Sequence, residues 1–113
     1  MIRKYNYEKL VYKYIMDDCE TTRLVELNEA KYENRVVAIF DNQSYGYAYG
    51  NLEFNHTFLS DCSFPTVYEF YNSGEYDLNE ADCYNITKKE FETEWKNAIR
   101  YCQEHSIIPN RLP

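Results

Sequence analysis

The sequence predicts an α+β fold, in which a small, mostly antiparallel sheet packs against one or two N-terminal helices and a C-terminal helix. Two observations lead to this fold class. Short segments rich in β-branched and aromatic residues, separated by turn residues, fill the middle of the chain, as is typical of strands. Apolar residues at helical spacing occupy both ends. We expect residues 1–113 to form a single domain, because 44% of them are hydrophobic and a chain of this length can bury a core.

The N-terminal third is predicted to be helical. Asn6 is a suitable N-cap, and apolar side chains recur after it at helical spacing, namely Tyr7, Leu10, Val11, Tyr14 and Ile15. Residues 21–33 fit either a second helix or a strand from Arg23 to Leu27. The helix is preferred, because the Glu, Ala and Lys residues that follow favour helices.

The middle of the chain begins with two predicted strands. Residues 35–40 form a β-branched and aromatic run before a turn at Asp41-Asn42, which predicts a buried strand. Tyr45, Tyr47 and Tyr49 alternate with small residues, so a strand here places three rings on one face. That face must be covered by another element or used for binding.

Two further strands are expected, at residues 52–59 and at residues 82–86. Between them, residues 64–71 fit either a strand or a short helix that begins at Pro65 and ends near Gly74. Residues 82–86 are the last strand of the predicted sheet.

The C-terminal helix has the clearest local signal. Thr87 and Glu90 match the capping box, in which each side chain bonds an exposed amide at the helix start. An apolar stripe follows at helical spacing, formed by Phe91, Trp95, Ala98, Ile99 and Cys102. The helix is expected to end by His105 or Ser106, because a residue that precedes proline, as before Pro109, disfavours helix.

The negative charge of the chain is local. The formal net charge is -7, and the region from Val36 to Thr87 contains no Lys or Arg. It carries eight carboxylates, namely Asp41, Glu53, Asp61, Glu69, Glu75, Asp77, Glu80 and Asp82. The same region holds seven of the thirteen Tyr and five of the six Phe residues. Because aromatic side chains anchor interfaces and like charges select opposite ones, this region favours a basic protein partner.

Other function classes fit the sequence less well. An acidic surface repels phosphates, so we expect no direct binding to nucleic acid. Only three glycines are present, which leaves few phosphate-binding loops, and no cofactor is predicted. The N-terminus has no apolar run for a secretory signal or a membrane span, so we expect a cytoplasmic protein with free cysteines and no membrane contact.

A metal or enzyme site is an alternative from another class. Cys102 and His105 lie about one helical turn apart and could bind zinc with His56 and Cys62, but the latter pair has no recognised spacing. A twelve-residue calcium loop from Asp77 lacks the required Gly at its sixth position and Glu at its twelfth. We therefore predict no metal and no enzymatic activity.

In its size, acidity, tyrosine content and closing helix from Lys88 to His105, the chain resembles small acidic immunity proteins that neutralise bacterial toxins, including those of contact-dependent growth inhibition systems. The resemblance implies an immunity protein, or antitoxin, that binds a basic toxin, in particular a nuclease. An alternative is a phage-encoded inhibitor of a host nucleic-acid-binding effector. In both cases the acidic protein would act as a polyanion mimic, in place of the nucleic acid. The residues expected to contact the partner are Asp41, Tyr45, Tyr47, Tyr49, Glu53, Asp61, Glu69, Tyr71, Glu75, Tyr76, Asp77, Glu80 and Asp82.

Overall fold

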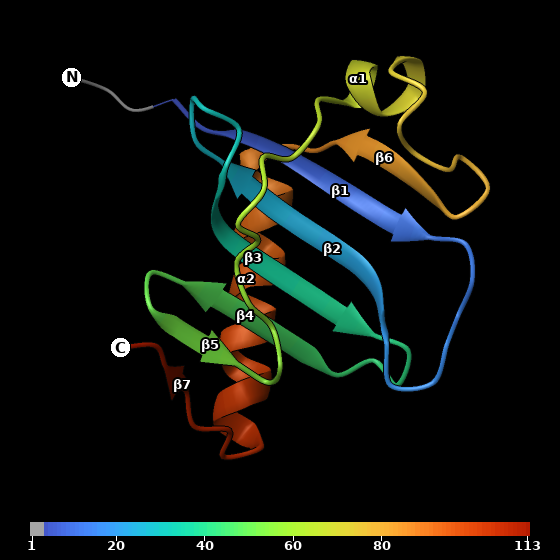
Figure 1. The fold of residues 1–113 in the computed structure, drawn as a ribbon. Coiled ribbons are helices and arrows are strands. Elements are labelled where there is room, and N and C mark those ends of the chain that lie inside the picture. The colour runs from blue at the N-terminus through green and yellow to red at the C-terminus, as the bar shows by residue number, and fades with distance from the viewer. Residues whose placement is uncertain (1–3) are drawn as a thin grey trace.

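A seven-stranded antiparallel sheet forms the body of the structure, a computed structural model that describes residues 4–113 (Figure 1). The strands are β1 (Asn6–Tyr12), β2 (Glu20–Leu27), β3 (Glu33–Phe40), β4 (Tyr45–Tyr49), β5 (Leu52–Phe54), β6 (Ala81–Asn85) and β7 (Asn110–Arg111). The helices of these residues are α1 (Val67–Asn72) and α2 (Lys88–Glu104). The fold class is therefore α+β, as predicted, with the sheet as its main element. Neither helix is long and apolar enough to cross a membrane.

The strands lie in the order β6-β1-β2-β3-β4-β5-β7. Strands β1 to β5 follow one another as antiparallel neighbours, whereas the two later strands join the outer edges. β6 pairs with β1, with Leu10 opposite Cys83, and β7 pairs with β5, with Glu53 opposite Asn110. β7 is a short strand that was not expected from the sequence. Both edges of the sheet are thus completed by segments from the second half of the chain.

The predicted helix after Asn6 is wrong, as is the preferred helix at residues 21–33, because both segments form strands of the sheet interior. The alternative for the second segment, a strand from Arg23 to Leu27, is confirmed and lies within β2. Both faces of β1 and β2 are covered by other parts of the chain. Tyr7 packs in the cluster beneath α2, whereas Leu10 packs in a cluster on the opposite face. The buried residues Leu24 and Val25 likewise point to opposite faces. Apolar residues on both faces hide the alternation of a strand, and the spacing that remains is close to that of a helix.

The remaining regular elements largely match the predictions. β3, β4 and β6 occur at the predicted runs, with ends shifted by at most two residues. α2 follows the N-cap Thr87, whose side chain accepts a bond from the Glu90 amide, and His105 is the C-cap. The Glu90 carboxylate forms an ion pair with Lys9 at 3.2 Å, so the side chain that would complete the capping box instead joins the helix to β1.

The predicted strand at residues 52–59 is only partly present, because β5 ends at Phe54. Asn55 and His56 both have positive φ angles, which turn the chain out of the sheet. Of the two possibilities for residues 64–71, the structure has the helix. Its N-cap is Thr66 rather than a start at Pro65 itself.

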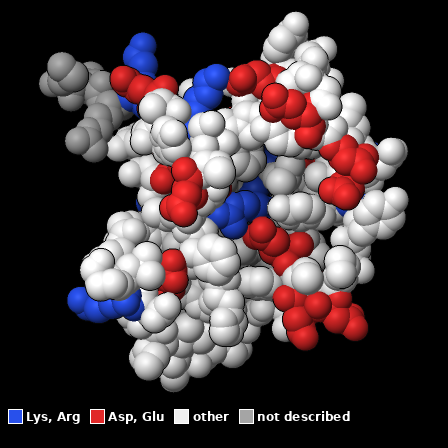
Figure 2. Space-filling view, viewed as in Figure 1, with Lys and Arg blue, Asp and Glu red and all other residues white. Residues whose placement is uncertain are grey.

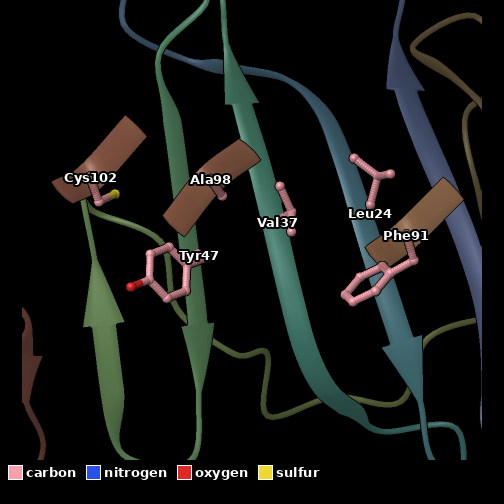
Figure 3. Packing of buried hydrophobic residues seen from close by; sticks show 6 residues of the cluster. All are labelled: Leu24, Val37, Tyr47, Phe91, Ala98 and Cys102. Atoms are coloured by element: carbon pink, nitrogen blue, oxygen red, sulfur yellow. The ribbon is translucent and has the colours of Figure 1, made fainter. Parts of the chain in front are cut away.

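One face of the sheet is covered by α2, which crosses it diagonally (Figure 1). The predicted apolar stripe faces the sheet, with Phe91, Ala98 and Cys102 fully buried. These three side chains meet Leu24, Val37 and Tyr47 of β2, β3 and β4 (Figure 3). This cluster is the main core of the protein.

The opposite face is covered without a long helix. Residues 55–66 run across it as an irregular segment, which we call the crossing segment, and α1 follows (Figure 1). Leu59 and Phe64 of this segment pack on a buried cluster formed by Val25, Leu27, Val36 and Ala48. Gly46 lies beneath the turn at its start, and a Cβ atom there would be only 2.0 Å from Thr57 Oγ1. The chain therefore needs a glycine at this point of β4.

Candidate protein-binding surface

The three tyrosines of β4 lie beneath α2 and not on an open face. Tyr47 is buried, with its ring stacked on Phe54 at 4.1 Å and at right angles to Trp95 at 5.0 Å. The Tyr45 hydroxyl donates to Glu94 on α2 at 3.2 Å. Tyr49 lies at the rim and is the most exposed of the three. The face that the sequence left open is thus covered by the C-terminal helix.

Burial has an electrostatic consequence for Tyr47. Desolvation raises the pKa of its phenol to about 12, because the charged form would lose its hydration. Tyr47 is therefore a core side chain that a partner cannot reach.

Three of the predicted carboxylates stand apart from one another. Asp41 lies in the turn after β3, and its Oδ1 atom is buried without a hydrogen-bond partner among residues 4–113. Glu53 lies on β5, where Asn110 of β7 donates to it at 3.4 Å. Asp61 is exposed in the crossing segment. Within residues 4–113, no side-chain hydrogen bond or ion pair joins these three carboxylates to one another or to the other predicted contacts.

The other predicted contacts come from one continuous stretch, formed by α1, the following loop and the start of β6. We call residues 67–82 the acidic segment. Its predicted partner-binding residues are Glu69, Tyr71, Glu75, Tyr76, Asp77, Glu80 and Asp82. Phe70 anchors it, since this buried side chain stacks on Tyr76 at 5.3 Å and packs with Ala81 and Cys83.

The start of α1 is held by a complete capping box. Glu69 donates its amide to Thr66 Oγ1 at 3.1 Å, and the Thr66 amide donates to the Glu69 carboxylate, also at 3.1 Å. Lys31 contacts the same carboxylate at 2.8 Å. Lys31, together with the amide and the hydroxyl of Thr66, lowers the pKa of Glu69 to about 2. The pattern Thr-x-x-Glu at residues 66–69 is visible in the sequence and could have located this helix.

Tyr71 closes the free edge of β6. Its hydroxyl accepts a hydrogen bond from the Cys83 amide at 3.0 Å and lies 3.3 Å from both the Cys83 carbonyl and the Asp82 carboxylate. The hydroxyl thus satisfies the amide and the carbonyl of Cys83, backbone groups that would otherwise be open to another strand at this edge. Tyr71 therefore stabilises this edge of the sheet as well as contributing to the surface.

The acidity of the segment is reduced by lysines from the first third of the chain. Lys31 pairs with Glu69, and Lys13 lies 3.7 Å from Asp82. Glu75, Asp77 and Glu80 are exposed and form no ion pair within residues 4–113. Figure 2 shows the carboxylates of this face in several separate groups, with basic side chains between some of them. The surface formed by carboxylates without an ion pair is therefore smaller than the sequence indicates.

Several exposed apolar side chains are not among the residues predicted from the sequence to contact a partner. Tyr68 on α1 and Leu78 in the following loop are exposed within the acidic segment. Tyr14, Ile15 and Met16, which follow β1, are exposed as well. The predicted N-terminal helix includes Tyr14 and Ile15 in its set of apolar side chains at helical spacing. Recognising β1 as a strand that ends at Tyr12 would have placed them in a loop.

The cysteines and histidines do not form a joint site. Cys102 is buried in the main core, with its thiol 3.7 Å from the Tyr45 carbonyl, whereas the exposed His105 ring stacks on Tyr101 at 3.9 Å. Burial raises the pKa of the Cys102 thiol to about 11 and that of Cys83 to about 12, which disfavours the thiolate needed by a nucleophile. No group of three potential metal ligands occurs in the described part of the chain.

A groove of about 600 Å³ lies between α2 and strands β1 to β3. Its apolar lining comes from Val11, Leu24 and Ile39. The ion pair between Lys9 and Glu90 is part of its wall. Charges of both signs border the groove, so it has no clear preference for an acidic or a basic ligand.

These features define a class of protein, an α+β domain with a seven-stranded antiparallel sheet, one long helix on one face and an exposed acidic segment beside the β6 edge. The model of the DUF6881 family, a domain of unknown function, matches residues 6–100. The chain therefore belongs to this family, and the matched region runs from β1 into the last turns of α2. No curated protein and no solved structure matches the chain.

Proposed function

We propose that the protein is an immunity-type inhibitor that binds and neutralises a basic toxin, of the nuclease class, through its acidic segment. One observation carries the proposal. Glu75, Asp77 and Glu80 are exposed, lack ion pairs within residues 4–113, and alternate with the exposed side chains of Tyr76 and Leu78.

The combination of charge and exposed apolar surface suits this role. Carboxylates without cations steer an oppositely charged partner and raise the rate of association. Aromatic side chains supply the buried contacts that slow dissociation. The active site of a nuclease is basic because it binds phosphates, so an acidic protein surface can occupy it in place of the nucleic acid.

The experiment is a pull-down with the tagged protein from a lysate of the source organism, at low and at moderate salt. We expect retention of one basic protein with nuclease activity that the added protein suppresses. The test variant Glu75→Gln/Asp77→Asn/Glu80→Gln removes three charges at nearly constant shape. It should slow association about tenfold and weaken the salt dependence of binding.

The control, Glu29→Gln/Glu104→Gln, removes two charges from exposed carboxylates that lie outside the acidic segment and are not among the predicted contacts. It should bind nearly as well as the unchanged protein. The proposal fails if the retained protein is not basic, or if the control variant loses as much binding per removed charge as the triple variant.

A further inference from the structure

The connection between β1 and β2 carries three consecutive large apolar side chains that face solvent. Tyr14 is 66% exposed, Ile15 is 74% exposed and Met16 is 65% exposed. We call residues 14–16 the apolar tip. Single exposed apolar residues are common, but an uninterrupted run of three is not, and such patches mark interaction surfaces.

The backbone around the apolar tip is fixed although its side chains are not packed. β1 ends at Tyr12, and the connection then leaves the sheet (Figure 1). Beyond the tip, the Cys19 amide donates to the Met16 carbonyl at 3.2 Å, and the Cys19 carbonyl accepts from the Asp41 amide at 3.2 Å. The tip is thus presented by a loop held at both ends, which reduces the entropy lost on binding.

The apolar tip lies beside the acidic segment. The Lys13 amide donates to the Glu80 carbonyl at 2.7 Å, and the Lys13 ammonium donates to the Leu78 carbonyl at 2.8 Å. Lys13 directly precedes Tyr14, so these bonds attach the base of the tip to the loop before β6. Leu78 is itself exposed and adds to the apolar surface at this edge.

The charge around the apolar tip is negative. Asp17 and Asp18 follow it in the sequence, and Asp77 and Glu80 flank Leu78 in the neighbouring loop. None of these four carboxylates has an ion pair within the described residues 4–113. The nearby cation, Lys13, is already engaged by a carbonyl and by Asp82.

We infer that the apolar tip, with Leu78, is the anchor by which the protein holds its basic partner. The partner site that fits is an apolar pocket bordered by Lys or Arg side chains. The inference rests on the proposed function and replaces the tyrosines of β4 as the source of apolar contact. A second copy of this chain fits poorly, because a symmetric contact would bring the aspartates of both copies together. An anionic membrane would be repelled for the same reason.

The test uses a photo-crosslinking amino acid, p-benzoylphenylalanine, at Ile15 of the full chain in the source lysate. The matched control carries it at Ile108, which is 83% exposed on the segment between α2 and β7. We expect the Ile15 variant, and not the Ile108 variant, to form an adduct with an identified basic protein. The yield of this adduct should fall as the salt concentration rises. The variant Tyr14→Ser/Ile15→Ser/Met16→Ser should lose at least about tenfold in affinity for that protein and keep its circular dichroism spectrum.

The outcomes separate this inference from the proposed function. Retention of a basic nuclease by the unchanged protein, with no adduct at Ile15, overturns the inference and leaves the proposed function standing. An adduct at Ile15 with a basic protein that is neither a toxin nor a nuclease supports the inference and contradicts the proposed function. An adduct of two copies, an adduct with lipid, or no adduct and no retained protein overturns the inference. Because the crosslinking variant changes one exposed residue, the test stands even if the triple variant fails to fold.

Discussion

The two faces of the sheet are covered by different kinds of structure, and each face has the side chains that its cover requires. α2 is a continuous helix that satisfies its own backbone, so it packs on the sheet through rings, as in the contact of Phe91 with Tyr7 at 5.4 Å. The crossing segment has no regular backbone pairing of this kind, although its Phe64 amide donates to the Lys31 carbonyl at 2.8 Å. It is held by Arg23, which donates to the Phe58 carbonyl at 2.8 Å, and by Glu33, which accepts from the Ser60 amide. Charged side chains are buried on this face because the irregular backbone needs hydrogen-bond partners.

Polar groups are also buried on the α2 face, but they join side chains to side chains. Glu26 accepts bonds from Tyr7, Asn34 and Arg35. The Arg35 guanidinium contacts Glu92 of α2 as well and lies 4.9 Å from the centre of the Phe91 ring. These contacts raise the pKa of Arg35, chiefly through the hydrogen bonds that it donates to Glu26. On this face the buried charges strengthen the attachment of α2, which already has its own backbone hydrogen bonds. On the opposite face, buried charged side chains supply hydrogen bonds that the irregular backbone of the crossing segment lacks.

The largest effect is expected from the α2 face. Phe91→Ala removes a fully buried ring from the main core and should cost about 3–5 kcal/mol of unfolding free energy, measured by urea denaturation. The conservative change Phe91→Leu should cost much less. Phe58→Ala is the control, since this ring is largely exposed on the crossing segment. Equal losses for Phe91→Ala and Phe58→Ala would contradict the assignment of the main core.

Arg23→Met tests the polar attachment of the crossing segment. The Glu33 side chain has no exposed surface, so loss of its cation should cost roughly 3 kcal/mol. Hydrogen exchange at the Ser60 amide should rise more than exchange in β3. The double variant Arg23→Met/Glu33→Leu should recover part of the loss, because no charge is then left buried. A double variant less stable than Arg23→Met would argue against this explanation.

Glu8 should make the stability of the α1 side depend on pH. Its side chain is buried with the Cys83 thiol 3.6 Å away, and burial raises its pKa from 4.5 to about 7. Glu69 on α1 raises it slightly and Lys31 lowers it. The folded protein thus binds this proton more tightly than the unfolded chain. The stabilising contribution is complete below pH 4.5 and is lost as the pH rises to about 7.

Glu8→Gln should remove this pH dependence. The free energy of unfolding of this variant should equal that of the unchanged protein at pH 4.5 and exceed it by on the order of 2 kcal/mol at pH 8. Denaturation at each pH measures the difference. The exposed change Glu29→Gln serves as the control. A difference between Glu8→Gln and the unchanged protein that is the same at both pH values would contradict the prediction.

The smallest effects concern the two helix caps. Thr87→Ala removes the acceptor for the Glu90 amide and should cost about 1 kcal/mol of global stability, since α2 covers the main core. Thr66→Ala makes the same change at α1. It should raise hydrogen exchange within α1 but shift the unfolding midpoint less, because the short helix covers only a small cluster. A midpoint shift from Thr66→Ala as large as or larger than that from Thr87→Ala would contradict this difference between α1 and α2.

Much of the fold was predictable where local signals dominate. The cap at Thr87 and the stripe from Phe91 onward located α2, and the β-branched run of residues 35–40 located β3. β1 and β2 could not be recognised in the same way. Leu24 and Val25 are both buried, because covers lie on both faces of the sheet, and those covers come from distant parts of the chain.

The candidate surface was predictable only as a region. The sequence showed where cations are missing, but not that Lys13 and Lys31 fold back onto Asp82 and Glu69. It also placed Tyr47 at the interface because alternation reveals that rings share a face and does not reveal what covers it. Long-range contacts decide both questions, and no local pattern reports them.

The pairing of β1 with β6 also sets the order in which the protein can be completed. β1 is made first, but its second neighbour is made only after five other regular elements. Throughout this time one edge of β1 is open to strands of other molecules, which is the usual route to aggregation during synthesis. Lys9 and Lys13 lie on or next to that edge, and charged lysines oppose such pairing. The lysines that end in ion pairs with Glu90 and Asp82 are thus well placed to protect the nascent chain before those partners exist.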